Sequence, residues 1–374
     1  MLTKTAAAAA ADPAADPAAA ADRRGELARA QDEFDADVIY LNTASLGLPP
    51  RRSLDALCRA LNDWRAGTAS PADYDASLEA ARSCYAALVG VDPSWVSTGS
   101  QVSVFAGLIA SNLPSGSEVL TVAGEFTSIV FPFLAQARRG VVVREVPLAK
   151  LACSVRASTT LVAVSAVQSA DGRLADLDSL TAACAATGTR ILLDTTQAVG
   201  WLPVDASRFA YTTGGGYKWL LAPRGTCFFT VQPEFVGDCI AQNAGWYGSD
   251  KPWESIYGGP LRLSEGARRF DVSPAWHSWV AQAPALELLA GVGPAALHAH
   301  ALGLANRFRT SIGLEPGNSA IVSVATNASV ADRLSRAGVL GSVRAGRLRL
   351  AFHVNNTETD ADRAAEAVAG HIRN

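Results

Sequence analysis

Residues 214–225 read GGGYKWLLAPRG and set Lys218 between two aromatic residues, directly after three glycines. The chain contains only four lysines against twenty-eight arginines, so a lysine in this setting needs a chemical reason. Arginine keeps its charge, whereas a desolvated lysine can lose its proton, and only the neutral amine attacks a carbonyl to form a Schiff base. A lysine whose stem lies along the flanking rings, with its charge in water, is the structural alternative.

A carboxylate lies at the end of a buried-looking strand twenty-four residues before this lysine. The segment Ile191-Leu192-Leu193 is apolar and of strand length, and it is followed by Asp194. Pyridoxal phosphate, a cofactor that forms a Schiff base with lysine, also needs a carboxylate whose charge keeps its pyridine nitrogen protonated. Lys218 and Asp194 together therefore predict a pyridoxal phosphate site, although Asp194 would also suit a helix N-cap or a turn.

Composition and charge narrow the class of protein. The chain has 374 residues, of which 49% are hydrophobic and 18% charged, so it can build a large core and lacks the composition of a disordered chain. A formal net charge of -3 provides no basic field for nucleic acid or an anionic membrane. The cysteines show no CxxC spacing and the histidines no HExxH motif, so we assign no metal and no disulfide framework.

The first 25 residues are low in complexity, with an alanine run interrupted by acids and prolines, and we expect them to be disordered. No apolar segment of export length forms there, and Arg23-Arg24 is followed by polar residues where a twin-arginine signal requires hydrophobic ones. No stretch approaches eighteen uninterrupted apolar residues. These features predict a soluble cytoplasmic protein that interacts with small molecules and other protein chains.

From Trp95 onward, apolar runs of strand length alternate with helical segments. The predicted strands are residues 95–98, 119–122, 141–143, 161–165, 191–193 and 227–231. Helices are predicted at residues 52–64, 77–89, 102–111, 128–138 and 177–186. This alternation predicts an α/β protein with a mostly parallel sheet covered by helices on both faces, whose ligands bind beyond the carboxyl ends of the strands.

The character of the sequence changes after about residue 275. A long helical region at 279–308 leads to two apolar runs, at 321–324 and 347–352, and to a helix at 359–369, which together suggest a smaller α+β domain. We therefore expect a large cofactor-binding domain at 51–275, and a linking helix with the small domain at 276–374. The segment 26–50 is expected to contribute to the small domain and to the active site.

Small residues mark a candidate phosphate site. The segment Thr98-Gly99-Ser100-Gln101 takes a predicted strand into a predicted helix. At such a helix N-terminus a phosphate would meet unpaired backbone N–H groups, a favourable helix dipole and the Ser100 hydroxyl. An ordinary capped helix is the alternative explanation of this segment.

The order of the motifs resembles the class V aminotransferase family of fold type I pyridoxal phosphate enzymes, over about residues 38–370. The ordered elements are the Gly99–Ser100 helix start, Glu125–Ser128, Ser165, Asp194-x-x-Gln197, Lys218, Arg268–Asp271, and Arg349 before Asn356–Glu358. The resemblance implies a three-layer fold in which Lys218 carries the cofactor and later moves the α-proton of the substrate. It also implies a homodimer with shared active sites, because Ser273 would reach the phosphate of the neighbouring subunit.

The resemblance assigns further contacts residue by residue. Asp194 would pair with the pyridine nitrogen, and Gln197 would contact the phenolic oxygen. The remaining predicted cofactor residues are Gly99, Ser100 and Gln101 at the phosphate, Tyr217 with its hydroxyl on the phosphate, Phe126 stacked on the ring, and Ser165.

Arg349 stands where the family keeps its clamp for the substrate carboxylate. A guanidinium fork suits that group because it makes two parallel, charge-assisted hydrogen bonds. Arg347, two residues earlier, is the competing candidate. Asn42, Ser45 and Trp246 are the other predicted substrate contacts.

Two observations bear on the reaction. Cysteine desulfurases need a nucleophilic cysteine shortly before the carboxylate-binding arginine, but no cysteine follows Cys239, so persulfide transfer is not expected. The segments 167–172 (VQSADG), 245–248 (GWYG) and 267–276 (ARRFDVSPAW) resemble the ergothioneine carbon-sulfur lyase branch of the family.

The leading hypothesis is a β-lyase that cleaves a cysteine S-conjugate, such as hercynylcysteine sulfoxide, to a thiol-level product, pyruvate and ammonia. The enzyme alternatives are a class V aminotransferase and an isopenicillin-N-epimerase-like isomerase. A protein of this fold that binds cofactor or a partner without turnover is the alternative from another class.

Overall fold

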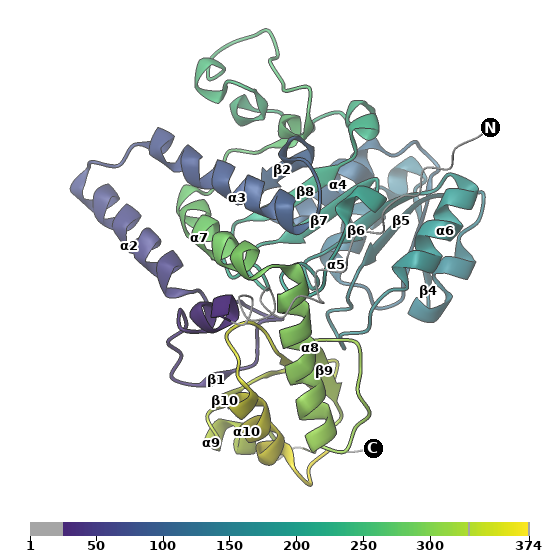
Figure 1. The fold of residues 1–374 in the computed structure, drawn as a ribbon. Coiled ribbons are helices and arrows are strands. Elements are labelled where there is room, and N and C mark those ends of the chain that lie inside the picture. Colours follow the sequence, from purple (N-terminus) through teal and green to yellow (C-terminus); the bar gives the residue numbers. More distant parts are fainter. Residues whose placement is uncertain (1–24, 328–329, 373–374) are drawn as a thin grey trace, which may run out of the picture.

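The computed structural model describes residues 25–327 and 330–372 and is built around a seven-stranded sheet. The strands are β2 (Val96–Gly99), β3 (Glu118–Val122), β4 (Val142–Val146), β5 (Thr159–Ser165), β6 (Arg190–Asp194), β7 (Tyr211–Gly215) and β8 (Cys227–Val231). Their order across the sheet is β2-β8-β7-β6-β5-β3-β4 (Figure 1). In this sheet only β8 runs antiparallel to its neighbours, so β2, β5, β6 and β7 end at the same edge.

Apolar side chains bury both faces of this sheet. In β5, Leu161 and Ala163 belong to one apolar cluster and Val162 and Val164 to another, because successive side chains of a strand point to opposite faces. The first cluster includes α4 (Val102–Asn112) and α5 (Thr127–Leu134), and the second includes α3 (Asp75–Leu88), α6 (Leu177–Thr187) and α7 (Trp276–Val292). Outside them, α2 (Arg51–Ala66) packs on α7. The predicted α/β fold with a mostly parallel sheet is confirmed.

The sequence analysis missed β7, the strand that leads into Lys218. Thr212 and Thr213 look polar in the sequence, yet both are fully buried. Burial is tolerated because each hydroxyl has a partner: Thr212 Oγ1 lies 2.7 Å from Thr230 Oγ1, and Thr213 Oγ1 lies 3.5 Å from Cys227 Sγ. Strand β7 also takes in the first two glycines of the motif at 214–225.

Two predicted helices differ in length from the observed ones. Helix α5 ends at Leu134, after an internal proline, and the segment Ala137–Arg139 is a short 3₁₀ turn. The helical region predicted at 279–308 is two helices, α7 and α8 (Pro294–Ser311), which meet at an angle of 85°. Gly293, with a φ of 84°, and a proline at the start of α8 explain the break.

No single helix in the described part of the chain is both long and apolar enough to span a membrane. Helices α7 and α8 pass such a test only as a pair, across their bend, and the apolar residues of α7 are buried in the core. The cytoplasmic location stays a prediction.

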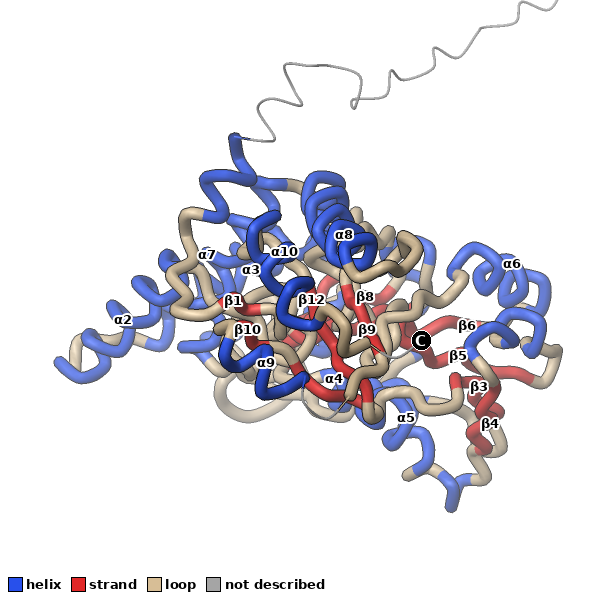
Figure 2. Tube along the Cα trace, turned by 90° about the horizontal axis from the view of Figure 1, so that it is seen from below, coloured by secondary structure: helices blue, strands red, loops and turns tan. Residues whose placement is uncertain are grey.

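The C-terminal elements share an apolar core with the N-terminal segment. Strands β9 (Ile321–Val324), β11 (Ser342–Arg344) and β12 (Arg347–Ala351) form an antiparallel sheet beside α8, α9 (Val330–Arg336) and α10 (Glu358–Val368) (Figure 2). Strand β1 (Ile39–Tyr40) pairs in parallel with β10 (Val339–Leu340), and Asn42 bridges to Ala351. The chain therefore enters the large sheet only after contributing to this second core.

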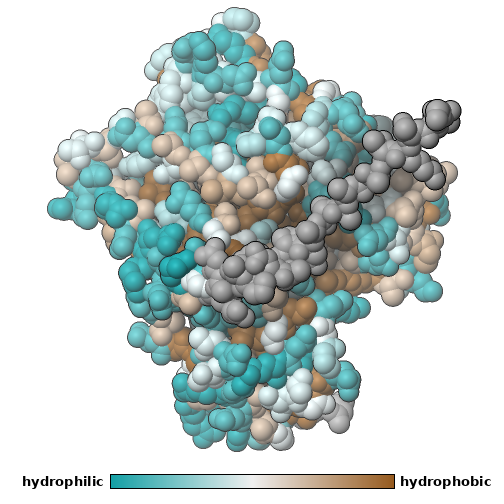
Figure 3. All heavy atoms as spheres, in the orientation of Figure 1, coloured by the Kyte–Doolittle hydropathy of each residue, from teal (hydrophilic) through white to brown (hydrophobic). Residues whose placement is uncertain are grey.

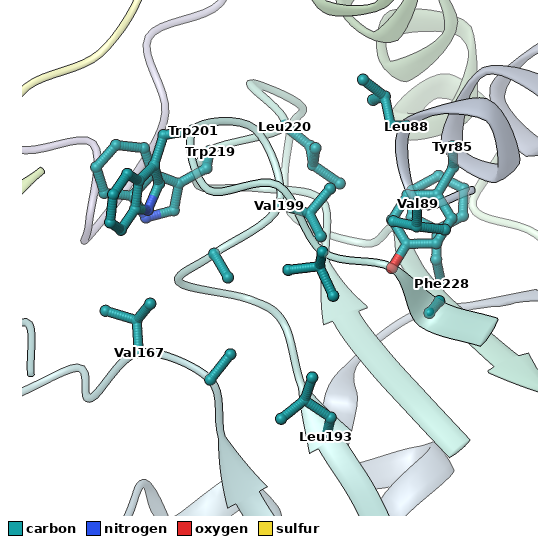
Figure 4. Close-up of a cluster of buried hydrophobic side chains, with 14 of the residues drawn as sticks. Tyr85, Leu88, Val89, Val167, Leu193, Val199, Trp201, Trp219, Leu220 and Phe228 are labelled. Atoms are coloured by element: carbon teal, nitrogen blue, oxygen red, sulfur yellow. The ribbon is translucent and has the colours of Figure 1, made fainter. Parts of the chain in front are cut away.

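Buried aromatic residues hold the segment around Lys218 against the helices (Figure 4). The rings of Trp201 and Trp219 have centroids 5.7 Å apart, and Tyr85 stacks on Phe228 at 4.1 Å. On the face shown in Figure 3, hydrophilic residues dominate both the upper loop and the lower end of the molecule.

Candidate active site

The carboxyl ends of the parallel strands form one pocket, which contains most of the residues predicted to bind the cofactor. Ser165 ends β5, Asp194 ends β6, and Lys218 follows β7. The predicted residues that line the pocket are Gln101, Phe126, Ser165, Asp194, Gln197, Tyr217 and Lys218. A cavity among α9, β10 and β11 is lined by none of the predicted site residues. The strand-end pocket is therefore the candidate active site.

The turn that carries Lys218 is fixed by its own backbone. Gly216 N donates to Thr226 O at 2.9 Å, and Ala222 N donates to Gly216 O at 3.0 Å. A Cβ at Gly216 would lie 2.1 Å from a side-chain oxygen of Thr226, so only glycine fits there. Leu221 has a φ of 62°, a strained value for leucine that the surrounding packing enforces. These constraints explain why a glycine stands two residues before the lysine and why the lysine lies in a rigid turn.

Distant segments pack against this turn. A Cβ at Gly47 would lie 2.1 Å from Lys218 O, and one at Gly200 would lie 2.4 Å from Trp219 O. His353, from the C-terminal core, has its Nε2 2.9 Å from Trp219 O. Burial lowers the pKa of His353 to about 3, so the neutral ring donates this hydrogen bond. The position of the lysine thus depends on the N-terminal segment and on the C-terminal core.

Burial changes the proton affinity of both central groups. Lys218 is 5% exposed, and burial lowers the pKa of its amine to about 8; the Asp194 charge opposes this change, and the Arg349 charge adds to it. Burial likewise raises the pKa of Asp194 to about 6. At pH 7 most of Asp194 is therefore ionised, and about a tenth of the Lys218 amine is in the neutral form that attacks a carbonyl.

Aromatic rings lie beside Lys218, and Thr196 holds Asp194 in place. Lys218 Nζ lies 5.2 Å from the ring centroid of Phe126 and 5.5 Å from that of Tyr217. Phe126 is 43% exposed although apolar, so it offers ring surface to a planar ligand. Asp194 Oδ1 accepts a hydrogen bond from Thr196 N at 2.8 Å. The Thr196 side chain also hydrogen-bonds this carboxylate, so Asp194 is held in place in the pocket lining.

A second buried carboxylate, Glu125, organises the pocket wall. Its Oε1 accepts from Ser165 Oγ at 2.7 Å and from Phe126 N at 2.8 Å. Its Oε2 accepts from Ser165 N and from Gln168 Nε2, both at 2.9 Å. The charge of Glu125 also contributes to the raised pKa of Asp194. The sequence analysis gave Glu125 no role, because three of its four donors lie forty or more residues away.

Gln197 lies in the pocket, but protein atoms engage its amide. Its Oε1 accepts from Trp219 Nε1 at 2.7 Å, and its Nε2 donates to Ala44 O at 2.9 Å and to Ser169 Oγ at 3.0 Å. Contact with the phenolic oxygen of a cofactor stays a prediction, and it would require one amide hydrogen to leave its protein acceptor.

The predicted phosphate site lies at the start of α4 and stays a prediction. Gln101 precedes the helix and no side chain caps it, while Ser100 is exposed beside this helix end. A Cβ at Gly99 would lie 2.7 Å from an aromatic ring of α4, so the strand can pass into the helix only through glycine. Arg224, which the sequence analysis did not select, lines the pocket with its Cζ 5.1 Å from the Tyr217 ring centroid. It adds a positive charge that suits an anionic ligand.

Arg349 is the buried arginine of the site. It is 2% exposed, its Nη2 donates to Ser45 Oγ at 2.7 Å, and its Nη1 donates to the Ser169 carbonyl. Its Nε is buried without a hydrogen-bond partner among the described residues. Arg347 is exposed and donates from Nη2 to Ser323 O at 3.0 Å. The structure therefore brings Arg349 to the pocket, through Ser169, and directs Arg347 elsewhere.

Several predicted residues are not part of the pocket lining, namely Gly99, Ser100, Ser45, Arg349, Asn42, Trp246 and Ser273. Asn42 bridges to β12, and its Oδ1 is buried without a partner in the described residues. Trp246 packs edge-on against Tyr247 and Trp253, with centroid distances of 4.9 and 5.0 Å. Ser273 is exposed. The structure does not bring Trp246 or Ser273 into the lining of the Lys218 pocket.

Comparisons with known sequences agree with this geometry. The profile of the family described as aminotransferase class-V matches residues 39–331. Isopenicillin N epimerase of Streptomyces clavuligerus is 28% identical over 396 aligned positions, covering 92% of this chain and 97% of that protein. Kynureninase of Deinococcus radiodurans is 29% identical over 309 positions, covering 77% and 75%.

Solved structures share the fold. A complex of the cystine C-S lyase C-DES with its reaction product cysteine persulfide matches with a TM-score of 0.79 at 20% identity, covering 90% of this chain and 98% of that one. A C-DES mutant with glycine covalently linked to the PLP cofactor matches with a TM-score of 0.81 at 20% identity, covering 91% and 99%.

The pocket residues fit pyridoxal phosphate. Asp194 is a buried carboxylate in the pocket lining that suits the ring nitrogen, Phe126 has an exposed ring face, the uncapped start of α4 suits the phosphate, and Lys218 has an amine of lowered pKa. The cofactor is pyridoxal 5′-phosphate. On the profile match and on this site, the chain belongs to the class V aminotransferase family, whose members are fold type I pyridoxal phosphate enzymes.

Proposed function

We propose that this enzyme is a carbon-sulfur β-lyase that cleaves a cysteine S-conjugate, with hercynylcysteine sulfoxide of the ergothioneine pathway as the type of substrate. The observation that carries the proposal is the set of groups around Lys218. The pocket lining contains one amine, with the rings of Phe126 and Tyr217 beside it, and contains no cysteine.

Lys218 would act as the base of the reaction. Bound pyridoxal phosphate supplies stabilisation of negative charge on the substrate α-carbon, with Asp194 keeping its ring nitrogen protonated. The neutral Lys218 amine takes the α-proton. The bond between the β-carbon and sulfur then breaks, and its electron pair leaves with the sulfur, as a thiolate from a thioether or as a sulfenate from a sulfoxide. The enamine released from the substrate takes up one water and yields pyruvate and ammonia.

Phe126 favours elimination over epimerisation by two bases. Inversion by two bases needs a proton donor on the face of the α-carbon opposite Lys218. Phe126, which is predicted to stack on the cofactor, has no proton to give. Lys218 is also the only lysine among the described residues that line the pocket.

No cysteine lines the Lys218 pocket, which argues against persulfide transfer, although Cys58 and Cys153 are exposed elsewhere. A cysteine nucleophile must be an accessible thiolate. Cys227, the cysteine closest in sequence to Lys218, is fully buried, and burial raises the pKa of its thiol to about 12. Together with the absence of any cysteine after Cys239 in the sequence, this supports direct elimination of the sulfur group.

Arg349 is proposed as the clamp for the substrate carboxylate. The Nε of its buried guanidinium has no partner among the described residues, and a bidentate pair of hydrogen bonds to a carboxylate would supply one. We also propose a homodimer in which Ser273 and Trp246, which lie outside the pocket lining of their own subunit, complete the site of the neighbouring subunit.

The test is a product assay on the purified holoenzyme with a panel of cysteine S-conjugates. Pyruvate is measured with a coupled lactate dehydrogenase reaction, and α-proton exchange is followed in D₂O by NMR. We expect stoichiometric pyruvate and ammonia with S-conjugates, and no product from Lys218→Ala. Transfer of the amino group to a keto acid without pyruvate would replace the proposal by an aminotransferase.

An isomerase is the second candidate, because isopenicillin N epimerase is 28% identical over 92% of this chain. The same D₂O experiment separates the two. Deuterium at the α-carbon with formation of the D-isomer, and no pyruvate from any S-conjugate, would establish the isomerase instead of the lyase.

A further inference from the structure

A second arginine converges with Arg349 on one hydroxyl group. Arg344, the last residue of β11, donates from Nη2 to Ser45 Oγ at 3.2 Å, while Arg349 donates from its own Nη2 to the same oxygen at 2.7 Å. Ser45 Oγ therefore accepts from two guanidinium groups, and its O–H has no acceptor among the described residues. Two cations and one free hydroxyl donor thus surround one point of the site.

No protein carboxylate balances this pair of charges. Neither arginine forms an ion pair with an aspartate or glutamate in the described ranges, although arginines elsewhere on the surface do so, as Arg307 does with Asp362 at 2.7 Å. Adjacent guanidinium groups repel each other in a partly buried site. Burial and the Arg344 charge together lower the pKa of Arg349 to about 10. The arrangement is that of an anion receptor.

The two arginines lie at different depths. Arg349 is buried and is tied through its Nη1 to Ser169, which lines the Lys218 pocket. Arg344 is exposed, and its second amino group donates to Val343 O at 2.8 Å. The inner arginine suits the α-carboxylate beside the reacting carbon. Arg344, nearer to solvent, would face the part of the substrate side chain that extends out of the pocket.

A tight hairpin fixes which arginine reaches Ser45. Strands β11 and β12 pair with Arg344 opposite Arg347, and the two residues between them, Ala345 and Gly346, have φ values of 46° and 73°. Positive φ at both positions is the mark of a two-residue hairpin turn. Arg347 leaves this turn toward Ser323. Of the two arginines that flank this hairpin turn, Arg344 therefore contributes to the anion receptor and Arg347 does not.

We propose that Arg344 binds a second anionic group of the substrate, so that the preferred amino acid carries a carboxylate or similar anion on its side chain in addition to the α-carboxylate. The inference rests on the proposed function only in taking the substrate to be an amino acid bound through Arg349. It adds a class of side chain that the reaction alone does not define.

The test compares ligands that differ only in this charge. The holoenzyme is titrated with S-carboxymethyl-L-cysteine and its neutral amide S-carbamoylmethyl-L-cysteine, and with the uncleavable pair L-glutamate and L-glutamine. Binding is read from the change in visible absorbance of the bound cofactor. The wild type should bind each carboxylate about 10-fold more tightly than the amide, a preference that falls as salt is raised from low to high ionic strength.

Three variants make the experiment specific. Arg344→Gln should lose the preference for the carboxylate while leaving the affinity for the amides within about 2-fold. Arg344→Lys should keep part of the preference because it keeps the charge. Arg347→Gln, the matched control on the same hairpin, should behave as the wild type. The melting temperature of each variant shows that it is folded.

Two results would overturn the proposal. If Arg344→Gln weakened carboxylate and amide ligands equally, Arg344 would be a second clamp for the α-carboxylate. If the wild type showed no preference for either carboxylate, there would be no second anion site. Loss of the glutamate preference in Arg344→Gln, with no pyruvate from any S-conjugate, would support the anion site and refute the lyase.

Discussion

Replacement of Asp194 by asparagine tests whether the site carries an electrostatic cost that the cofactor relieves. Burial raises the pKa of Asp194 from the usual 3.8 to about 6, so the ionised carboxylate is unfavourable in the folded protein without cofactor. Asparagine is uncharged and of similar shape, and its Oδ1 can still accept the hydrogen bond from Thr196 N, which is 2.8 Å from Asp194 Oδ1.

The magnitude follows from the pKa change. One pKa unit corresponds to about 1.4 kcal/mol, so ionising Asp194 costs the cofactor-free protein about 3 kcal/mol at neutral pH. With an unfolding entropy of about 2.1 cal/mol/K per residue, this raises the melting temperature of the Asp194→Asn protein by about 4 °C. The size of this gain depends on pH. Well below 3.8 both folded and unfolded wild type are protonated, so the difference vanishes; it grows as pH rises from about 4 to about 6 and stays constant above that.

The assay is thermal unfolding of the cofactor-free proteins at pH 4 and pH 7.5, followed by the same measurement with pyridoxal phosphate. Cofactor should raise the melting temperature of Asp194→Asn less than that of the wild type, because asparagine cannot balance a protonated ring nitrogen. Asp176→Asn is the control. Asp176 is an exposed helix cap with a pKa lowered by its hydrogen bond from Ser179, so its replacement should give no gain at pH 7.5.

Two outcomes would refute this reasoning. A cofactor-free Asp194→Asn protein that melts at or below the wild-type temperature at pH 7.5 would mean that the buried carboxylate is not unfavourable. A gain of equal size at pH 4 and pH 7.5 would mean that the effect has no connection with ionisation.

Three further predictions concern the lysine and its surroundings. Gly47→Ala should destabilise the protein by about 1–3 kcal/mol in denaturant unfolding, because the new Cβ would lie 2.1 Å from Lys218 O. The control is Gly303→Ala in α8, which should be neutral or stabilising because no atom lies within 4 Å of its new Cβ. The rate at which the cofactor-free protein captures pyridoxal phosphate should rise with pH and level off above about 8, as the Lys218 amine loses its proton. Arg349→Gln should raise KM for an amino-acid substrate about 10- to 100-fold, and an unchanged KM would exclude Arg349 as the clamp. The same variant should move the pH at which the rate of cofactor capture levels off to a higher value, because the Arg349 charge lowers the pKa of Lys218.

Most of the large sheet was predictable because its signals are local. Parallel strands buried on both faces are continuous apolar runs, and β5 and β6 show such runs in the sequence. The strand β7 was missed because its buried residues are threonines, whose burial depends on partners in the neighbouring strand β8. The bend between α7 and α8 was missed although Gly293 and Pro294 mark it.

The cofactor end of the site was also predictable in part. Asp194 and Lys218 each end or follow a strand, and parallel strands bring such ends together at one edge. Glu125 was not assigned, because a carboxylate shows its role only when its four donors are known. The contacts of Gln197 with Trp219 and Ala44 were likewise invisible, since Ala44 lies 153 residues away.

The sequence by itself determined the chemistry of the cofactor: one lysine in a glycine-rich turn, one acid at a strand end and a small-residue helix start, each recognisable from its neighbours. Only the tertiary structure brought together the residues that we propose to bind the substrate. Arg349 meets Ser45 across 304 residues and Ser169 across 180, and the hairpin register chose Arg344 rather than Arg347 to join it. The reason is physical: backbone geometry along a few residues defines a strand end, whereas a charge cluster exists only after distant segments have packed together.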